Sequence, residues 1–177
     1  RRLAFNAQNV AAWKKWRREL TATLKEITGY TTMLRSPLKP KIAERLDLGD
    51  HYRERVEIQT EPGIIMPMYV LVPKGEPPFP AILAPHGHGG GGKLTVAGCG
   101  DTPQLAEAIK NFRYDYGVQF VRAGMIAFCP DARGFGERQE RAVKGDILRQ
   151  SCREINNMAL PLGQTVTGMW AWDLHRL

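Results

Sequence analysis

A glycine-rich segment with two histidines holds the residues of this chain best suited to chemistry. Its sequence is His86-Gly87-His88-Gly89-Gly90-Gly91-Gly92-Lys93, and it follows a short apolar run at residues 81–84. Glycine allows positive φ angles and lets backbone N–H groups approach a ligand closely. A loop of this kind after a strand suits two chemistries, namely oxyanion stabilisation in acyl transfer and phosphate binding. The choice between them depends on the elements that hold the loop.

The phosphate-binding hypothesis rests on the spacing of Gly87, Gly92 and Lys93, which matches GxxxxGK, the first part of a nucleotide-binding motif. Leu94 stands where the motif needs a Ser or Thr hydroxyl for Mg²⁺. We also expect no helix to start in residues 95–100, although phosphate binding depends on a helix N-terminus. Nucleotide binding at residues 87–93 is therefore the weaker hypothesis, and it is kept as an alternative.

The acyl-transfer hypothesis assigns the chemistry to backbone groups. The N–H groups of His88 and Gly89 would donate hydrogen bonds to the oxyanion, while His86 and Gly87 would support the loop. Loss of one such donor costs roughly 3–4 kcal/mol of transition-state stabilisation. The loop after the second apolar strand, which includes Asp131 and Arg133, is expected to be held by pairing or hydrogen bonding of those two side chains.

The order of elements predicts an α/β fold with a parallel sheet flanked by helices. A hairpin is expected from residues 53–60 and 64–72 around the turn at 61–63, and buried strands are expected at 81–84 and 125–129. Helices are expected at residues 103–112, 115–122, 142–158 and 165–177. Ligands bind at the carboxyl ends of strands in such sheets, and both glycine-bearing loops lie there.

Residues 9–28 predict an amphipathic helix, with Asn9 as its N-cap and Gly29 as its stop. We expect its Trp and Leu stripe to pack on the domain. A helix that binds a partner or a membrane surface is the alternative, and it would make the chain a non-catalytic interaction module. Residues 31–50, with Pro37 and Pro40, predict a linker. Residues 1–50 thus form a basic helix and linker ahead of a domain at residues 51–177.

The composition is that of an ordinary globular domain, with 43% hydrophobic and 24% charged residues among 177. No stretch approaches the roughly 20 apolar residues of a membrane span. The net charge of +7 belongs entirely to residues 1–55, which hold 13 Lys and Arg against 6 Asp and Glu. This distribution predicts a solvated basic helix face rather than a nucleic-acid-binding domain.

Three cysteines, Cys99, Cys129 and Cys152, form neither a disulfide framework nor a zinc motif. None lies in a setting typical of a nucleophile, and His86 and His88 lack further ligands at metal-binding spacing. We therefore expect no metal and no cofactor. Because the sequence starts with Arg1 and Arg2 rather than Met, we expect residues ahead of it, and we predict no compartment.

Four segments together resemble the bacterial α/β-hydrolases grouped with acetyl xylan esterases and dienelactone hydrolases. They are residues 86–93, 114–117, 130–138 and 168–177, of which the DxRGxG turn at 131–136 and the Trp-rich helix are the most specific. The resemblance covers roughly residues 50–177. It implies a serine-type hydrolase of small-molecule or carbohydrate esters that uses a Ser–acid–His triad.

The chain departs from this resemblance at the nucleophile. No G-x-S-x-G elbow occurs in it, since Ser36 and Ser151 both lack flanking glycines. The resemblance places all three triad members after the helix at 165–177, so His175 is expected to be structural, and Trp170 and Trp172 to pack rather than stack on sugars. We expect residues 51–177 to be the N-terminal half of an α/β-hydrolase domain, inactive by itself.

Overall fold

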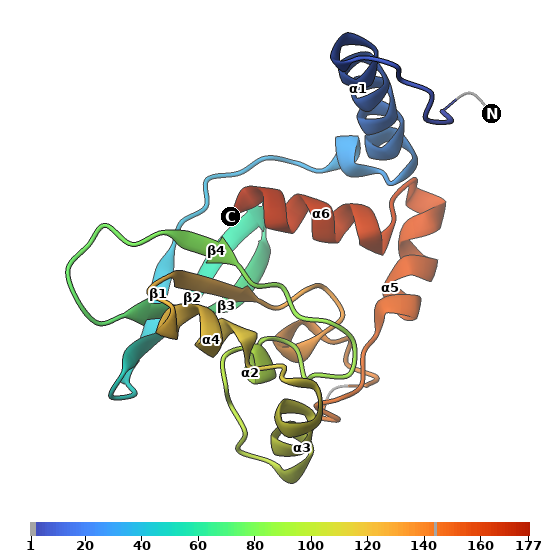
Figure 1. Cartoon of the computed structure of the whole chain (residues 1–177). Coiled ribbons are helices and arrows are strands. Elements are labelled where there is room, and N and C mark those ends of the chain that lie inside the picture. The colour runs from blue at the N-terminus through green and yellow to red at the C-terminus, as the bar shows by residue number, and fades with distance from the viewer. Residues whose placement is uncertain (1–2, 144) are drawn as a thin grey trace.

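The computed structural model describes residues 3–143 and 145–177, which form a mixed α/β structure around a five-stranded sheet (Figure 1). The strand order is β1-β2-β3-β5-β4. The bounds are β1 Lys41–Asp47, β2 His51–Glu61, β3 Ile64–Pro73, β4 Ala81–Leu83 and β5 Ile126–Pro130. β4 and β5 are parallel, and the other neighbours are antiparallel. The predicted hairpin and the predicted pair of parallel strands are confirmed, but β4 is not the buried strand that was expected, because it lies at the sheet edge and leaves Ala81 and Leu83 exposed.

Six α-helices are described, and local capping explains where several of them begin. Their bounds are α1 Val10–Ile27, α2 Lys93–Val96, α3 Pro103–Phe112, α4 Tyr116–Arg122, α5 Cys152–Ala159 and α6 Val166–Arg176. The side chains of Asn9, Thr102 and Thr165 each accept a hydrogen bond from a backbone N–H of the first helical turn. The predicted helices at residues 9–28, 103–112, 115–122 and 165–177 are confirmed.

The core lies on both faces of the sheet. On one face α2 and α4 cover β3 and β5, and the buried cluster includes Leu71, Val96, Val118, Ala127 and Cys129. The opposite face buries Val56, Ile58, Met66, Met68 and Val70 from the hairpin. A third cluster joins Met33, Ala159, Met169 and Trp172, and so fixes α6 against α5 and the segment after α1.

The expectations for residues 31–50 and 142–158 were wrong. Residues 31–50 are not a plain linker, because Lys41–Asp47 form β1 and pair with β2 along the sheet edge. Every β1 residue is exposed, so this strand has no buried face to produce a hydrophobic pattern. The helix expected at residues 142–158 begins only at Cys152, because residues 141–143 and 147–148 form turns; residue 144 lies outside the described residues.

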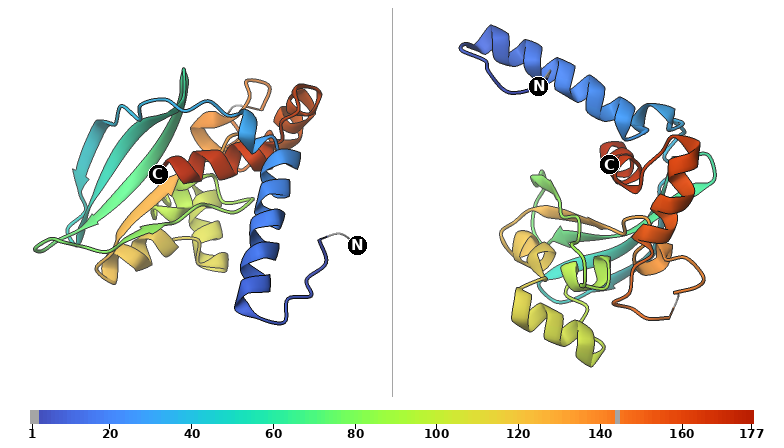
Figure 2. Two further views of the ribbon diagram at one scale, coloured as in Figure 1. Left: turned by 90° about the horizontal axis from the view of Figure 1, so that it is seen from above. Right: turned by 90° about the vertical axis from the view of Figure 1, so that its right-hand side faces the viewer.

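α1 forms as predicted but does not pack its apolar stripe on the domain. None of its side chains is buried in the described structure, and Val10 and Ile27 are about two-thirds exposed, at 66% and 65%. Figures 1 and 2 show the helix projecting away from the sheet, attached at its C-terminal end near α6. That attachment is specific, because the carbonyl of Thr28 accepts hydrogen bonds from the backbone N–H and hydroxyl of Thr165.

Candidate active site

The two loops predicted to form the site lie together at the carboxyl ends of β4 and β5. The ring of His86 joins them, because its Nε2 accepts a hydrogen bond from the backbone N–H of Ala132 at 3.0 Å. Its Nδ1 lies 3.0 Å from the carbonyl oxygen of Gly87 and must carry the proton, since Nε2 is the acceptor. Burial lowers the pKa of His86, which favours this neutral form. His86 thus supports the loop.

The glycines of the loop allow backbone and side chains to approach closely. Gly92 has φ of 68°, and a Cβ atom there would lie 2.4 Å from Oδ1 of Asp131. Gly89 also has a positive φ, of 79°. His88 and Gly89 are exposed, and within the described residues no hydrogen bond engages their N–H groups. Two adjacent backbone donors are therefore available at the end of β4.

An ionic cluster that the sequence did not suggest fixes both loops. The ammonium of Lys93 lies 2.6 Å from Asp131 Oδ2 and 2.6 Å from Glu137 Oε1, and its side chain is only 2% exposed. The backbone N–H groups of Lys93 and Glu137 donate to the same Asp131 carboxylate, at 2.8 and 3.1 Å. Burial opposes the charge of Lys93, but the two carboxylates outweigh it and raise the pKa of the ammonium.

This cluster also weakens the nucleotide-binding hypothesis, although for a different reason than the sequence offered. No helix begins within residues 95–100, but α2 begins at Lys93, directly after the glycines, so a missing helix N-terminus no longer counts against phosphate binding. The decisive feature is Lys93 itself, whose buried ammonium is paired with the buried Asp131 carboxylate and with the partly exposed Glu137 carboxylate. A phosphate-binding lysine must instead reach the phosphates of the ligand.

Asp131 and Arg133 each hold their loop, but they do so through other partners. Arg133 forms two hydrogen bonds with Asp173 of α6, at 2.9 and 3.0 Å, and an ion pair with Glu61 at 2.6 Å. Arg138 adds a contact to Asp173 at 2.8 Å. Burial would raise the pKa of Asp173, but the two guanidinium groups outweigh it and lower that pKa. The β5 loop is thereby fastened to α6 and to the hairpin.

The exposed ring of His88 lies among aromatic side chains and near a thiol. Phe135 packs edge-on against His86 and His88, with ring centroids 4.6 and 5.1 Å apart. Sγ of Cys152 lies 3.9 Å from Nε2 of His88. Burial raises the pKa of the Cys152 thiol, which disfavours a thiolate nucleophile. The sequence offered no signal for this contact, since the two residues are 64 positions apart.

Neither serine occupies the position of a nucleophile in this structure. Ser151 is fully buried, and its hydroxyl donates to Gly134 and accepts from the N–H of Glu140. Ser36 is 8% exposed and lies beside Gln59 in the hairpin. The indole N–H groups of Trp170 and Trp172 donate to the carbonyls of Arg133 and Thr60. His175 is exposed on α6 and packs edge-on near Tyr30.

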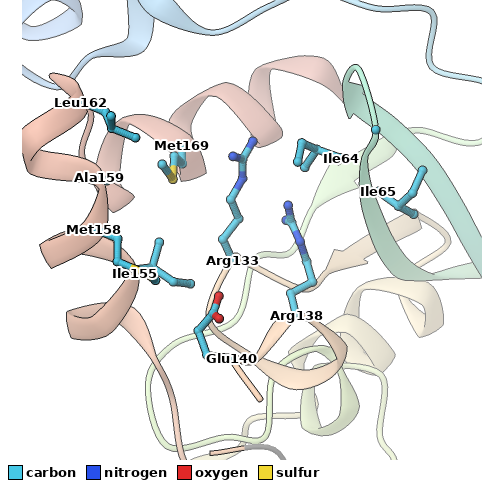
Figure 3. A pocket seen from close by; sticks show the side chains of 11 residues that line it. Ile64, Ile65, Arg133, Arg138, Glu140, Ile155, Met158, Ala159, Leu162 and Met169 are labelled. Carbon is cyan, nitrogen blue, oxygen red and sulfur yellow. The ribbon is translucent and has the colours of Figure 1, made fainter. Parts of the chain in front are cut away.

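A hollow of about 390 Å³ lies beside the β5 loop. Its walls are apolar, with Ile64 and Ile65 from the hairpin facing Ile155 and Met158 of α5 (Figure 3). Arg133 and Arg138 extend between these walls, and Glu140 lies at the base in the same view. This hollow offers apolar surface beside the charged side chains of the loop that follows β5.

Comparison with solved structures shows that the fold is that of known esterase structures. A protein from Bacteroides fragilis, provisionally named an acetyl xylan esterase, superposes with a TM-score of 0.82 at 24% identity. The match covers 99% of this chain and 45% of that protein. A methylesterase gives a TM-score of 0.56 at 18% identity, over 75% of this chain and 27% of its own.

Acetyl xylan esterase 1 from Thermoanaerobacterium sp. JW/SL YS485 gives a TM-score of 0.53 at 17% identity, over 88% of this chain and 42% of that chain. The chain therefore spans less than half the length of each of these three proteins. A scan against protein families found no match. A search of curated proteins found none either.

Two further observations concern the described residues. None of the helices in residues 3–143 and 145–177 is both long and apolar enough to cross a membrane. Over the same ranges, His, Cys, Asp and Glu side chains do not gather in groups of three that could hold a metal ion.

Proposed function

We propose that this chain provides the oxyanion-stabilising half of the active site of a serine-type α/β-hydrolase that cleaves carboxylic esters. The observation that carries the proposal is the pair of available N–H groups of His88 and Gly89 at the carboxyl end of β4. The shared fold with acetyl xylan esterases and a methylesterase supports a small-molecule or carbohydrate ester as substrate. No cofactor is needed for this chemistry.

The physical basis is the charge that develops during acyl transfer. When a nucleophile attacks the ester, the carbonyl oxygen becomes an oxyanion, and fixed N–H donors stabilise it without reorganising. The loop that carries the donors is held by the His86 ring and by the buried contact between Lys93 and Asp131. Such rigid support is what an oxyanion site requires, because a small displacement of the donors weakens the stabilisation.

The nucleophile is proposed to come from polypeptide outside residues 1–177. Ser151 and Ser36 are both buried against backbone groups, and neither is hydrogen-bonded to a histidine in the described structure. The similar protein from B. fragilis is more than twice as long as the part of it that this chain matches. A downstream Ser–acid–His triad would attack the carbonyl carbon while His88 and Gly89 hold its oxygen.

Hydrolysis of p-nitrophenyl acetate by the 177-residue chain tests the proposed division of the site. We expect no turnover above the buffer rate, and the Ser36→Ala, Ser151→Ala double variant should behave in the same way. Turnover that survives this double substitution contradicts the proposal. If such turnover disappears in Cys152→Ala, the thiol next to His88 is the nucleophile.

A second candidate function rests on the exposed stripe of α1. Because none of its side chains is buried, the helix is available to dock on another surface, as an interaction module would require. Pull-down with the whole chain and with a chain lacking residues 1–27 separates the two functions. An interaction module predicts a partner that binds the whole chain and is lost when α1 is removed, whereas the esterase proposal predicts no such partner.

A further inference from the structure

α1 carries an exposed apolar row along one side. Val10, Trp13 and Leu24 lie within about 60° of one another around a helix of 3.6 residues per turn, and all three are exposed. Ile27 is also exposed and extends the row to the last residue of the helix. A surface helix normally buries such a row in the core. In the described structure this row is left open to solvent.

The neighbouring side of α1 is already occupied, which limits the open apolar surface to that row. Phe5 packs edge-on against Trp16 with ring centroids 5.0 Å apart, and the indole N–H of Trp16 donates to the carbonyl of Leu3 at 3.1 Å. The segment before α1 thus folds back on the Trp16 side. Figure 2 shows α1 projecting away from the sheet, so a partner can reach most of its length.

A second row, beside the apolar one, consists of four cations, namely Lys14, Arg17, Arg18 and Lys25. They lie within about 100° of one another around the helix. Their exposed side chains line a hollow on the surface of α1. The two rows adjoin, since the guanidinium of Arg17 lies 5.4 Å from the centroid of the Trp13 ring. Within residues 3–143 and 145–177, none of the four cations pairs with a carboxylate.

This charge decides the class of partner. Glu19 and Glu26 lie on the side of α1 away from the apolar row, so they do not offset the four cations beside that row. A second copy of α1 would bring two like-charged rows together, which opposes self-association. The cations span residues 14–25, about 16 Å along the helix, and their long side chains suit a surface of distributed negative charge. A Trp side chain such as Trp13 suits the boundary between water and an apolar layer.

We propose that α1 lies flat on an anionic lipid surface, with Val10, Trp13 and Leu24 inserted among the head groups and the four cations beside the lipid phosphates. An amphipathic helix of this kind lies in the plane of the interface, with its apolar side chains about 5–10 Å deep and its basic residues attracted to anionic lipids. The proposal rests on the second candidate function, which uses α1 for docking, and is independent of the esterase proposal.

Co-sedimentation of the whole 177-residue chain with lipid vesicles tests this proposal. One set of vesicles contains equal parts of phosphatidylcholine and phosphatidylglycerol, and the other contains phosphatidylcholine alone. We expect saturable binding to the anionic vesicles and at least about tenfold weaker binding to the neutral ones. High salt should release the chain, because it screens the attraction to the surface.

A chain that sediments with neither set of vesicles, or equally with both, overturns the proposal. If it binds neither set but captures a protein that is lost when α1 is deleted, the docking function stands and the lipid surface is wrong. The comparison of the two lipids needs no variant.

Substitutions locate the contact. A chain with Lys14→Gln, Arg17→Gln and Arg18→Gln should bind the anionic vesicles on the order of 100-fold more weakly, because each cation near such a surface contributes to binding. Trp13→Ala should weaken binding about tenfold, because the ring no longer enters the apolar layer. The four side chains are exposed, so circular dichroism of both variants should match the parent.

The matched control removes the same charge from other elements. It carries Lys110→Gln, Arg113→Gln and Arg153→Gln, at exposed positions at the end of α3 and on α5. This control should bind the anionic vesicles nearly as well as the parent. Equal losses in the two triple variants, or undiminished binding without the cations of α1, would overturn the proposal.

Discussion

The buried ammonium of Lys93 links the two loops of the candidate active site. It bridges Asp131 and Glu137, which follow β5, although it lies in the loop that follows β4. Lys93 is 38 positions from Asp131 and 44 positions from Glu137, yet the three residues form one cluster. No spacing rule in the sequence indicates such a contact. The GxxxxGK pattern drew attention to the correct lysine, but its ammonium contacts carboxylates rather than a site open to phosphate.

Lys93→Met should strongly destabilise the fold. The substitution leaves the fully buried Asp131 carboxylate without its cation, and removal of one partner of a buried pair costs roughly 3–5 kcal/mol. Chemical denaturation measures the change in the free energy of unfolding. Lys74→Met is the matched control, because Lys74 pairs with Asp47 at the surface and should change little. Equal effects of the two substitutions would contradict the structural role given to Lys93.

Glu137 should make stability depend on pH. Burial would raise the pKa of its carboxyl, but hydrogen bonds from Arg55 and Lys93 outweigh it and lower the pKa from 4.5 to about 2. A carboxyl whose pKa is lowered by folding stabilises the folded state at pH values above its pKa in the unfolded chain. This contribution disappears as the pH falls from about 4.5 towards 2. Between pH 6 and pH 2, the free energy of unfolding should fall less steeply with decreasing pH in Glu137→Gln than in the parent protein. Parallel curves for the two proteins would show that this carboxyl does not titrate as described.

Among the elements, α1 differs most from the others in how it is held. Its sequence satisfies the rules for an amphipathic helix, including the Asn9 cap, yet the described structure leaves its stripe uncovered. The segment just after it is firmly fixed, because Tyr30 packs edge-on against Trp172 with centroids 5.4 Å apart, and Met33 is buried beside it. α1 and the segment just after it should therefore contribute very differently to the stability of the fold.

Two truncations test this difference. Deletion of residues 1–27 should change the melting temperature little, because no side chain of α1 is buried. Deletion of residues 1–35 also removes Tyr30 and Met33, and their loss exposes part of the cluster around Trp172. This longer deletion should lower the melting temperature by about 5 °C or more. Thermal unfolding followed by circular dichroism gives both values. A large loss from the shorter deletion would show that α1 is packed on the molecule.

Much of the fold could be predicted because its signals are local. Caps at Asn9, Thr102 and Thr165 mark helix starts, and alternation in β2 and β3 marks the hairpin. β1 could not be predicted, since an exposed edge strand lacks a buried face. The position of the candidate loops followed from the parallel strands, whereas the partners of Asp131 and Arg133 depend on distant residues, Lys93 and Asp173.

At the scale of the whole molecule, almost all of this chain superposes on part of the B. fragilis protein provisionally named an acetyl xylan esterase. The superposition covers 99% of the chain at a TM-score of 0.82, although only 24% of the residues are identical. The agreement thus rests on preserved element order and packing rather than on sequence. The glycine-rich loop follows β4 at one edge of this sheet, and the N–H groups of its His88 and Gly89 have no hydrogen-bond partner among the described residues; we propose this loop as half of an ester-cleaving site.

The most direct measurement is the turnover number of a chimera that joins this chain to the part of the B. fragilis protein that it does not match. His88→Pro removes the proposed N–H donor at a position without positive φ, whereas His88→Ala keeps the donor and removes only the imidazole. With p-nitrophenyl acetate, we expect His88→Pro to lower kcat roughly 100- to 1,000-fold with little change in KM, and His88→Ala to remain near the parent value. Equal losses in both variants, or an unchanged kcat in His88→Pro, would contradict the role proposed for this loop.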